Sequence, residues 1–205
     1  MPPGTTDYYL TNKPIGDTYG TVEFGLTKRM RDRWQLTSGF DWTKRDVSSE
    51  FSEDPNTLFW NSRNTQTSGW TLKASGSYVF NHGVLVGLSY NAMKGEPYGR
   101  LFTVTEPYLR LADPTRTTPL LQGNMTIMAE RVGTYYLPAI NVINLRAQKE
   151  FVIKDTQRLH LMVNIFNLTG AETVTDVVET TNRAFRAPST NIAGTVLRVG
   201  ARYTF

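Results

Sequence analysis

Few side chains in this chain of 205 residues have the types and spacing that catalysis or metal binding requires. Cysteine is absent, which excludes thiol catalysis, disulfide scaffolds and zinc ribbons. His82 and His160 are the two histidines, and their separation in the sequence argues against a histidine-rich metal centre. The sequence contains no G-x-S-x-G, P-loop, G-x-G-x-x-G or H-E-x-x-H pattern. We therefore expect neither enzymatic activity nor a bound metal or cofactor.

The remaining candidates for proton transfer have simpler interpretations. Glu23 and Asp41 occupy polar positions of two neighbouring alternating segments, where we interpret them as a solvated pair rather than an acid/base dyad. His160 occupies a polar position of a later alternating segment and is interpreted as a contact residue rather than a general base. His82 falls in a predicted turn. Individual side chains therefore do not indicate a function, and the composition and the pattern of secondary structure are the remaining sources of information.

The composition excludes several broad classes of protein. Hydrophobic residues make up 40% of the chain and aromatic residues 12%, which argues against intrinsic disorder. No apolar run is long enough to cross a membrane as a helix, which takes about 18 residues or more. The net charge is +4, but lysine and arginine are scattered rather than gathered in one stripe. We therefore expect no nucleic-acid partner. Two small basic groups, at 28–33 and 154–158, fall at predicted turns.

Alternation of apolar and polar residues with a period of two, the pattern typical of strands, dominates the sequence. It predicts strands at 18–30, 33–44, 67–80, 84–93, 141–151, 158–168 and 192–205. The connections between them are alternately short and long, and the long ones are polar. A short hairpin is also expected inside the second long connection, from 100–105 and 125–130. The pattern therefore predicts an all-β fold in which about seven long strands form an antiparallel up-and-down meander.

The strand lengths favour a membrane barrel over a soluble sandwich or a lipocalin-like barrel. The predicted strands are about ten to fourteen residues long, whereas a soluble strand averages about five to six. A tilted strand crosses a bilayer with about nine to eleven residues, and strands cross lipid only as a closed barrel. The polar positions hold Thr, Ser, Gly, Asn and Gln with few charges, which fits the wall of a water-filled lumen. Short turns, long loops and aromatic residues near strand ends complete the pattern of a transmembrane β-barrel segment with short periplasmic turns and long extracellular loops.

The C-terminal residues form a more specific motif. Arg198, Gly200, Tyr203 and Phe205 follow the spacing R-x-G-x-x-Y-x-F, with phenylalanine as the last residue. This motif resembles the C-terminal β-signal of bacterial outer-membrane proteins. The resemblance implies recognition by the barrel assembly machinery, in which an exposed strand pairs with the machine by β-augmentation.

Further stretches carry a family resemblance in their order and spacing. They are residues 23–30, 33–36, 72–78, 95–98, 137–141, 145–149 and 164–168. Together with the C-terminus they resemble the barrel of TonB-dependent outer-membrane receptors. The resemblance is closest to the branch with an N-terminal carboxypeptidase-regulatory-like domain.

The resemblance implies a place in the bacterial outer membrane and a role in transport. In that family a barrel of about 22 strands encloses a plug, through which TonB drives uptake of a scarce nutrient such as a siderophore, cobalamin, a glycan or a peptide. The implied partners are outer-membrane lipid and lipopolysaccharide, the assembly machinery, and the transported small molecule, with TonB acting only through the plug. Seven strands are a third of such a barrel, and bacterial single-chain barrels have even strand numbers. We therefore expect 18–205 to be the C-terminal part of a larger barrel and 1–17 to be a loop or N-terminal extension.

Loop aromatics are the candidates for ligand contact that the resemblance implies. They are Trp60, Tyr98, Phe102, Tyr108, Tyr135 and Tyr136, with Phe51 and Phe59 as further candidates. The alternative is that these rings pack the loops against one another. Two other functions also remain open at this point: a small outer-membrane barrel enzyme, such as a protease or a lipid-acyl hydrolase, and a structural or adhesive barrel without transport.

Overall fold

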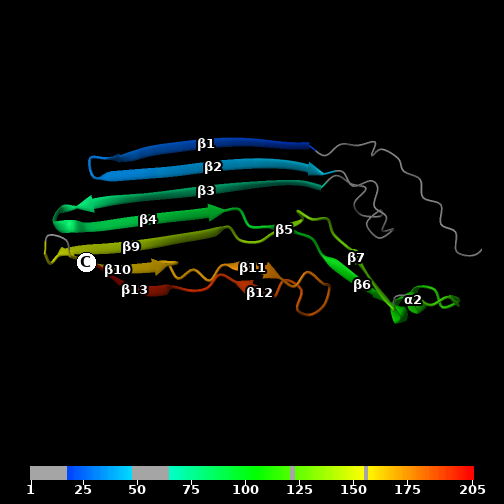
Figure 1. Cartoon of the computed structure of the whole chain (residues 1–205). Coiled ribbons are helices and arrows are strands. Elements are labelled where there is room, and N and C mark those ends of the chain that lie inside the picture. Colours follow the sequence, from blue (N-terminus) through cyan, green and yellow to red (C-terminus); the bar gives the residue numbers. More distant parts are fainter. Residues whose placement is uncertain (1–17, 48–64, 121–122, 155–156) are drawn as a thin grey trace, which may run out of the picture.

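A computed structural model describes residues 18–47, 65–120, 123–154 and 157–205. Seven long strands form one antiparallel sheet, and each pairs with the next long strand along the chain (Figure 1). The strands in sheet order are β1 (Thr18–Arg31), β2 (Trp34–Val47), β3 (Thr65–Phe80), β4 (Val84–Met93), β9 (Ile140–Val152), β10 (Arg158–Phe166) and β13 (Val196–Thr204). The predicted all-β, seven-stranded antiparallel meander is confirmed.

The register gives the sheet one apolar and one polar face, because directly paired residues project to the same side. One row of paired residues runs Phe24, Phe40, Leu72 and Ala92 across β1 to β4. The adjacent row, one residue along each strand, runs Glu23, Asp41, Thr71 and Met93 and projects to the other side. The alternation in the sequence is therefore the cause of the two faces.

Short turns join β1 to β2, β3 to β4 and β9 to β10 at one end of the sheet, here called the turn end (Figure 1). Asp32 and Arg33 form a two-residue turn with φ of 53° and 70°, the backbone of a type I′ hairpin. The predicted connection at 31–32 is thus displaced by one residue. A 3₁₀ turn, η1 (Asn81–Gly83), follows β3, and Gly83 has a φ of 73° there. The C-terminus lies at the same end.

Long connections gather at the opposite end, here called the loop end. Between β4 and β9 the chain forms β5 (Pro97–Tyr98), β6 (Leu101–Thr105), α2 (Glu106–Ala112), β7 (Asn124–Met128) and β8 (Tyr135–Tyr136). Between β10 and β13 it forms β11 (Val174–Val177) and β12 (Pro188–Asn191). β6 pairs with β7, which confirms the expected hairpin, and β5 pairs with β8.

Four predicted strand boundaries differ from the structure by two residues or more. β2 continues to Val47 instead of residue 44, and β3 begins at Thr65 instead of residue 67. The sixth strand ends at Phe166 instead of residue 168, because Asn167 has a φ of 50° and turns the chain out of the sheet. The last strand begins at Val196 instead of residue 192, because residues 188–191 pair with β11 as a separate strand. The turn at Asn167 ends one strand, and the pairing of residues 188–191 with β11 delays the start of the other. A period of two in the sequence indicates neither.

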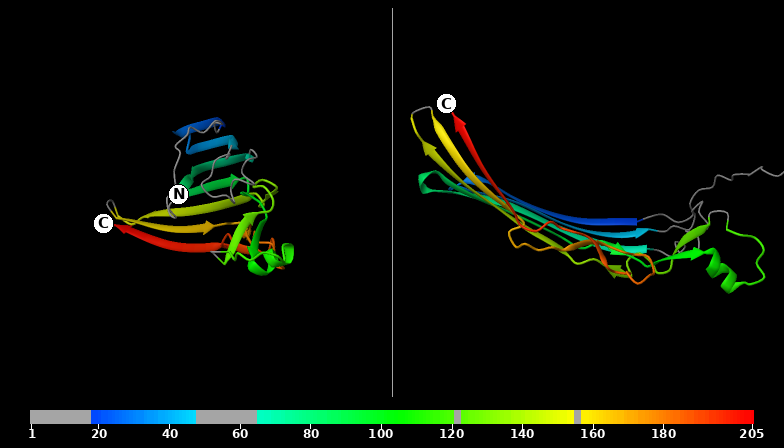
Figure 2. Two further views of the ribbon diagram at one scale, coloured as in Figure 1. Left: turned by 90° about the vertical axis from the view of Figure 1, so that its right-hand side faces the viewer. Right: turned by 90° about the horizontal axis from the view of Figure 1, so that it is seen from below.

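The sheet is curved and open (Figure 2). Within the described residues no strand pairs with the outer edge of β1 or β13, which lie at opposite edges. The described part of the chain therefore forms an open sheet and not a closed barrel. It also lacks a second layer, since Ala92 and Tyr98 are its buried hydrophobic residues. No helix among the described residues has the length and apolar character needed to cross a membrane.

Candidate functional site

The apolar face of the sheet is exposed over its whole width. Its large side chains with high exposure are Val22, Phe24, Leu26, Trp34, Trp42, Tyr78, Phe80, Leu88, Phe151, Leu161, Val163, Leu197, Val199 and Tyr203. Exposure is high at both edges of the sheet: Phe24 on β1 is 66% exposed, and Val199 on β13 is 71% exposed. A monomeric soluble protein rarely exposes a contiguous apolar patch larger than a few hundred Å². This surface therefore indicates contact with an apolar environment or partner.

The polar face carries hydroxyl, amide and guanidinium groups in rows across the strands. Asn144 donates from Nδ2 to Ser89 Oγ at 3.1 Å, and the hydroxyls of Thr21 and Thr43 lie 3.1 Å apart. Arg146 donates from Nη2 to Gln148 Oε1 at 2.9 Å. Phe166 and Val196, paired where β10 and β13 begin to separate, are apolar exceptions on this face. The two faces of one sheet thus present opposite chemistry.

A charged group occupies the polar face near the turn end. Arg158 Nη1 lies 2.5 Å from Glu150 Oε1, while His160 Nδ1 lies 3.9 Å from the other carboxylate oxygen. Gln148 Nε2 lies 3.2 Å from the same histidine nitrogen. Glu23 and Asp41 are directly paired across β1 and β2, as expected. No group of three or more metal-ligating side chains occurs in the described part of the chain.

Two of the predicted ligand-contact aromatics meet at the loop end. Tyr98 stacks on Tyr135 with ring centroids 5.4 Å apart, and Phe185 meets Tyr135 edge-on at 6.0 Å. The guanidinium of Arg186 lies 5.2 Å from the Tyr135 ring. Tyr98 is 5% exposed, so its ring packs the loops in this structure. We call these residues, with Arg100 and Glu130, the loop cluster.

Polar contacts order the β4–β9 side of the loop cluster, and cation–π contacts and backbone hydrogen bonds join it to the β10–β13 connection. Tyr135 donates its hydroxyl to Glu130 Oε1 at 3.2 Å, and Arg100 Nε lies 3.4 Å from Glu130 Oε2. The Arg100 guanidinium also lies 4.3 Å from the Phe185 ring centroid. Backbone bonds from Leu101 N to Glu179 O and from Thr181 N to Leu101 O fix the same junction. The β4–β9 and β10–β13 connections are thus held against each other at this point.

The other predicted aromatics that the structure describes have ring contacts outside the loop cluster. Phe102 meets Tyr108 edge-on at 5.5 Å, and Tyr108 is exposed. Tyr136 lies under the ammonium of Lys94, which is 4.0 Å from its ring centroid. Trp60, Phe51 and Phe59 lie outside the described residues. The structure therefore stacks Tyr98 on Tyr135, whereas Phe102 has its ring contact with Tyr108.

Sequence reasoning missed the residue that anchors the base of the last loop. Asn167 is buried, and its Nδ2 donates to Ala171 O at 3.0 Å and Ala193 O at 2.8 Å. Its backbone N–H donates to Asn144 Oδ1 at 3.0 Å. The available signal was an asparagine at the end of an alternating run, since asparagine tolerates positive φ better than most residues. Phe185 and Arg186 had no comparable signal in the polar segment that contains them.

Three loop carboxylates have shifted pKa values. The pKa of Asp113 is lowered, because the Thr115 hydroxyl and N–H both donate to it. The pKa of Glu106 is lowered, because the Leu120 N–H donates to it at 3.0 Å and the Arg110 guanidinium donates at 3.2 Å. The pKa of Glu179 is raised by partial burial and by the neighbouring charge of Asp176. These shifts result from local packing of the loops, and the carboxylates concerned are not an acid/base pair.

The C-terminal motif lies on the edge strand β13. Arg198 pairs with Asn164 and Gly200 with Met162 on the polar face, whereas Tyr203 pairs with Leu159 on the apolar face. The Phe205 ring lies 6.1 Å from that of Tyr203. The far side of β13 has no partner strand among the described residues, which is the arrangement that strand addition requires. Recognition by the assembly machinery stays a prediction.

Comparison of the chain with protein-family models, with curated proteins and with solved structures finds no match.

Proposed function

We propose that this chain forms a section of the wall of a transmembrane β-barrel in the bacterial outer membrane. The observation that carries the proposal is the exposed apolar face, which spans all seven long strands opposite a polar face. In the membrane the apolar face meets lipid tails, and the polar face lines a lumen. Burying one Val, Leu or Phe side chain contributes about 1.5–3 kcal/mol, so removing this face from water is a large favourable term.

The strand lengths fit this role. β1 and β2 each have 14 residues and β9 has 13, while β10 and β13 have nine each. A bilayer is crossed by about nine to eleven tilted residues, so every long strand reaches across it. The longer strands of the N-terminal half extend beyond the hydrocarbon at the loop end.

The two open edges of the sheet favour a larger barrel, of which the described strands form one part. An unpaired backbone group in hydrocarbon costs several kcal/mol, and both β1 and β13 present a row of them. We propose that further strands close these edges and that the whole is a TonB-dependent receptor for energised uptake of a scarce nutrient. The family-like stretches at 72–78 and 145–149 fall in β3 and β9, inside the wall. In this proposal the loop cluster shapes the outer entrance, and the chain performs no chemistry.

Neighbouring residues of one strand give the sharpest test of the wall. Leu88 lies on the apolar face and is 48% exposed, while Ser89 lies on the polar face. The chain has no cysteine, so Leu88→Cys and Ser89→Cys each accept one spin label. In lipid vesicles we expect the label at 88 to be relaxed by oxygen, which partitions into hydrocarbon, and the label at 89 by a water-soluble nickel complex. Val163→Cys and Asn164→Cys repeat the comparison on β10.

Equal access of the nickel complex to positions 88 and 89 would overturn the wall proposal. The receptor proposal has a separate test in the native mass of the protein in the outer-membrane fraction. A species several times heavier than the 23.2 kDa chain supports closure by further strands. A stable, membrane-inserted species of 23.2 kDa would be consistent with the wall proposal but would reject the proposal of a larger receptor.

A further inference from the structure

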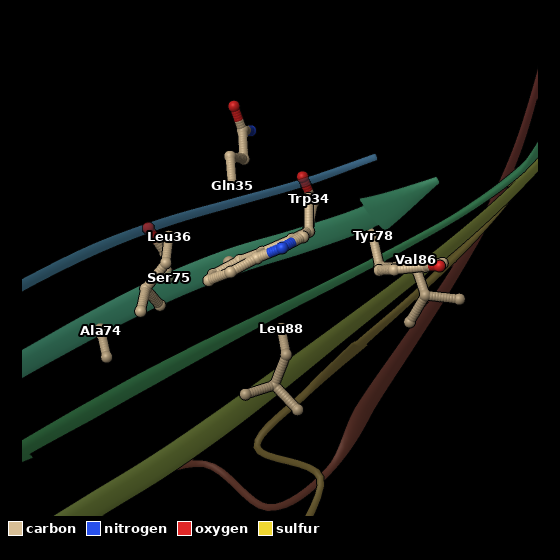
Figure 3. Close-up of a pocket in the computed structure, with 10 residues that line it drawn as sticks. Trp34, Gln35, Leu36, Ala74, Ser75, Tyr78, Val86 and Leu88 are labelled. Atoms are coloured by element: carbon tan, nitrogen blue, oxygen red, sulfur yellow. The ribbon is translucent and has the colours of Figure 1, made fainter. Parts of the chain in front are cut away.

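The apolar face is hollowed where β2, β3 and β4 lie side by side, close to the turn end. The hollow has a volume of about 550 Å³, and we call it the Gly76 hollow (Figure 3). Gly76 pairs with Leu36 and Leu88, so one row of the face has no side chain between two leucines. In Figure 3 the side chains of Trp34, Leu88 and Val86 border the space, while Gln35 extends to the other side of the sheet. The walls are therefore aliphatic and aromatic.

A lysine lies against the aromatic wall of the Gly76 hollow. Lys28 pairs with Leu36, which puts it on the apolar face in the same row as Gly76. Its ammonium lies 3.8 Å from the Trp34 ring centroid. It also donates to Arg31 O at 2.8 Å and to Trp34 O at 3.0 Å. The charge is thus held at the turn end of the hollow rather than among the leucines.

A β-bulge adds a second cation at the same place. The register of β1 against β2 shifts between Lys28 and Arg31, so β1 has one extra residue there. As a result Arg31 pairs with Trp34 and shares the apolar face with it, whereas strict alternation would place Arg31 on the polar face. Asp32 lies 3.8 Å from the arginine, but both side chains are highly exposed, and such surface pairs contribute little. Residues 28–33 hold four basic side chains and this one acid.

We propose that the Gly76 hollow binds one anionic phospholipid, with an acyl chain in the hollow and its phosphate between Lys28 and Arg31. This proposal rests on the proposed function, because it requires the apolar face to meet lipid. The apolar walls fit an acyl chain, and two cations at one end of them fit a phosphate that carries no compensating ammonium group. A second copy of the chain is the competing occupant, and a zwitterionic lipid is the competing lipid.

Fluorescence quenching by brominated lipids tests the proposal on the full chain in phosphatidylethanolamine vesicles. A minor fraction of the lipid is brominated phosphatidylglycerol in one sample and brominated phosphatidylethanolamine in the other. Subtracting the signal of Trp34→Phe isolates the emission of Trp34. One basic side chain near a membrane surface enriches an anionic lipid by about five-fold, so we expect several-fold stronger quenching by the brominated phosphatidylglycerol. Salt at 1 M should remove most of this difference.

Charge-matched variants decide between a local site and a general attraction. Lys28→Gln with Arg31→Gln should abolish the difference between the two lipids. Lys73→Gln with Arg146→Gln removes two charges from the polar face and should preserve it. Ala74→Phe, which fills the hollow without changing charge, should also abolish the difference if the acyl chain lies there.

Each contrary result has a distinct meaning. Equal quenching by the two lipids in the unmodified chain overturns the anionic-lipid site and leaves the wall proposal in place. A difference that persists in the Lys28/Arg31 variant also overturns the site. Absence of quenching by either lipid, together with a dimer in analytical ultracentrifugation, rejects both this site and the lipid-facing wall.

Discussion

At the turn end of the sheet two residues, Asp32 and Arg33, suffice to join β1 to β2, whereas at the loop end the chain from β4 to β9 builds two small sheets and a helix. The turn end is fixed by backbone geometry and pairing between strands adjacent in sequence. The loop end depends on contacts between distant segments, such as Tyr135 with Phe185. The sheet is therefore specified by local turns and by pairing of neighbouring strands, whereas the loop end forms only when the whole sheet is assembled.

The largest expected effect is at Gly95, at the base of the loop end. A Cβ at this position would collide with the carbonyl of Leu137, so the backbones of the two loop segments must separate. We expect Gly95→Ala to destabilise the protein by about 3 kcal/mol, the upper range for overpacking. The measurement is urea unfolding of the protein refolded in detergent micelles.

Gly25→Ala is the matched control for this substitution. Gly25 lies in β1, and a Cβ there meets nothing within 4 Å among the described residues. Because glycine weakens a strand, alanine should stabilise the protein by about 0.5 kcal/mol or leave it unchanged. Equal losses at positions 25 and 95 would contradict the contrast between the two ends.

The second prediction for the loop end concerns Asn167, at the base of the connection between β10 and β13. Asn167→Ala removes the two amide bonds to Ala171 O and Ala193 O and places alanine at a φ of 50°. We expect a loss of about 2 kcal/mol, since buried carbonyls lose their donors. Hydrogen exchange should show faster exchange in residues 167–195 with little change in the β1–β2 hairpin. Asn167→Gly, which relieves the backbone, separates the conformational part from the hydrogen bonds.

These contrasts also explain what the sequence could predict. Alternation identified all seven long strands and both faces, because pairs such as Phe24 with Phe40 follow from a period of two. The first turn was displaced by one residue, because the bulge between Lys28 and Arg31 leaves no mark in the period. Tyr98 and Tyr135 were recognised as loop aromatics, but their stacking with each other depends on the pairing of β5 with β8. Phe185 joins them from 50 residues further along the chain than Tyr135, and no local rule predicts that contact.

The smallest effect is expected at the turn end, where the backbone preference of the two turn residues determines the change in stability. Asp32 and Arg33 both adopt positive φ, which Asn and Gly tolerate better in a type I′ turn. Arg33 also donates to Asn81 Oδ1, an exposed contact that Arg33→Gly removes. We expect Asp32→Asn with Arg33→Gly to stabilise the protein by about 0.5–1 kcal/mol, because relief of backbone strain exceeds the loss of one exposed hydrogen bond. A higher urea midpoint at an unchanged slope is the measurement, and a lower midpoint would show that the Arg33–Asn81 contact outweighs the strain, making the turn end dependent on a distant partner as well.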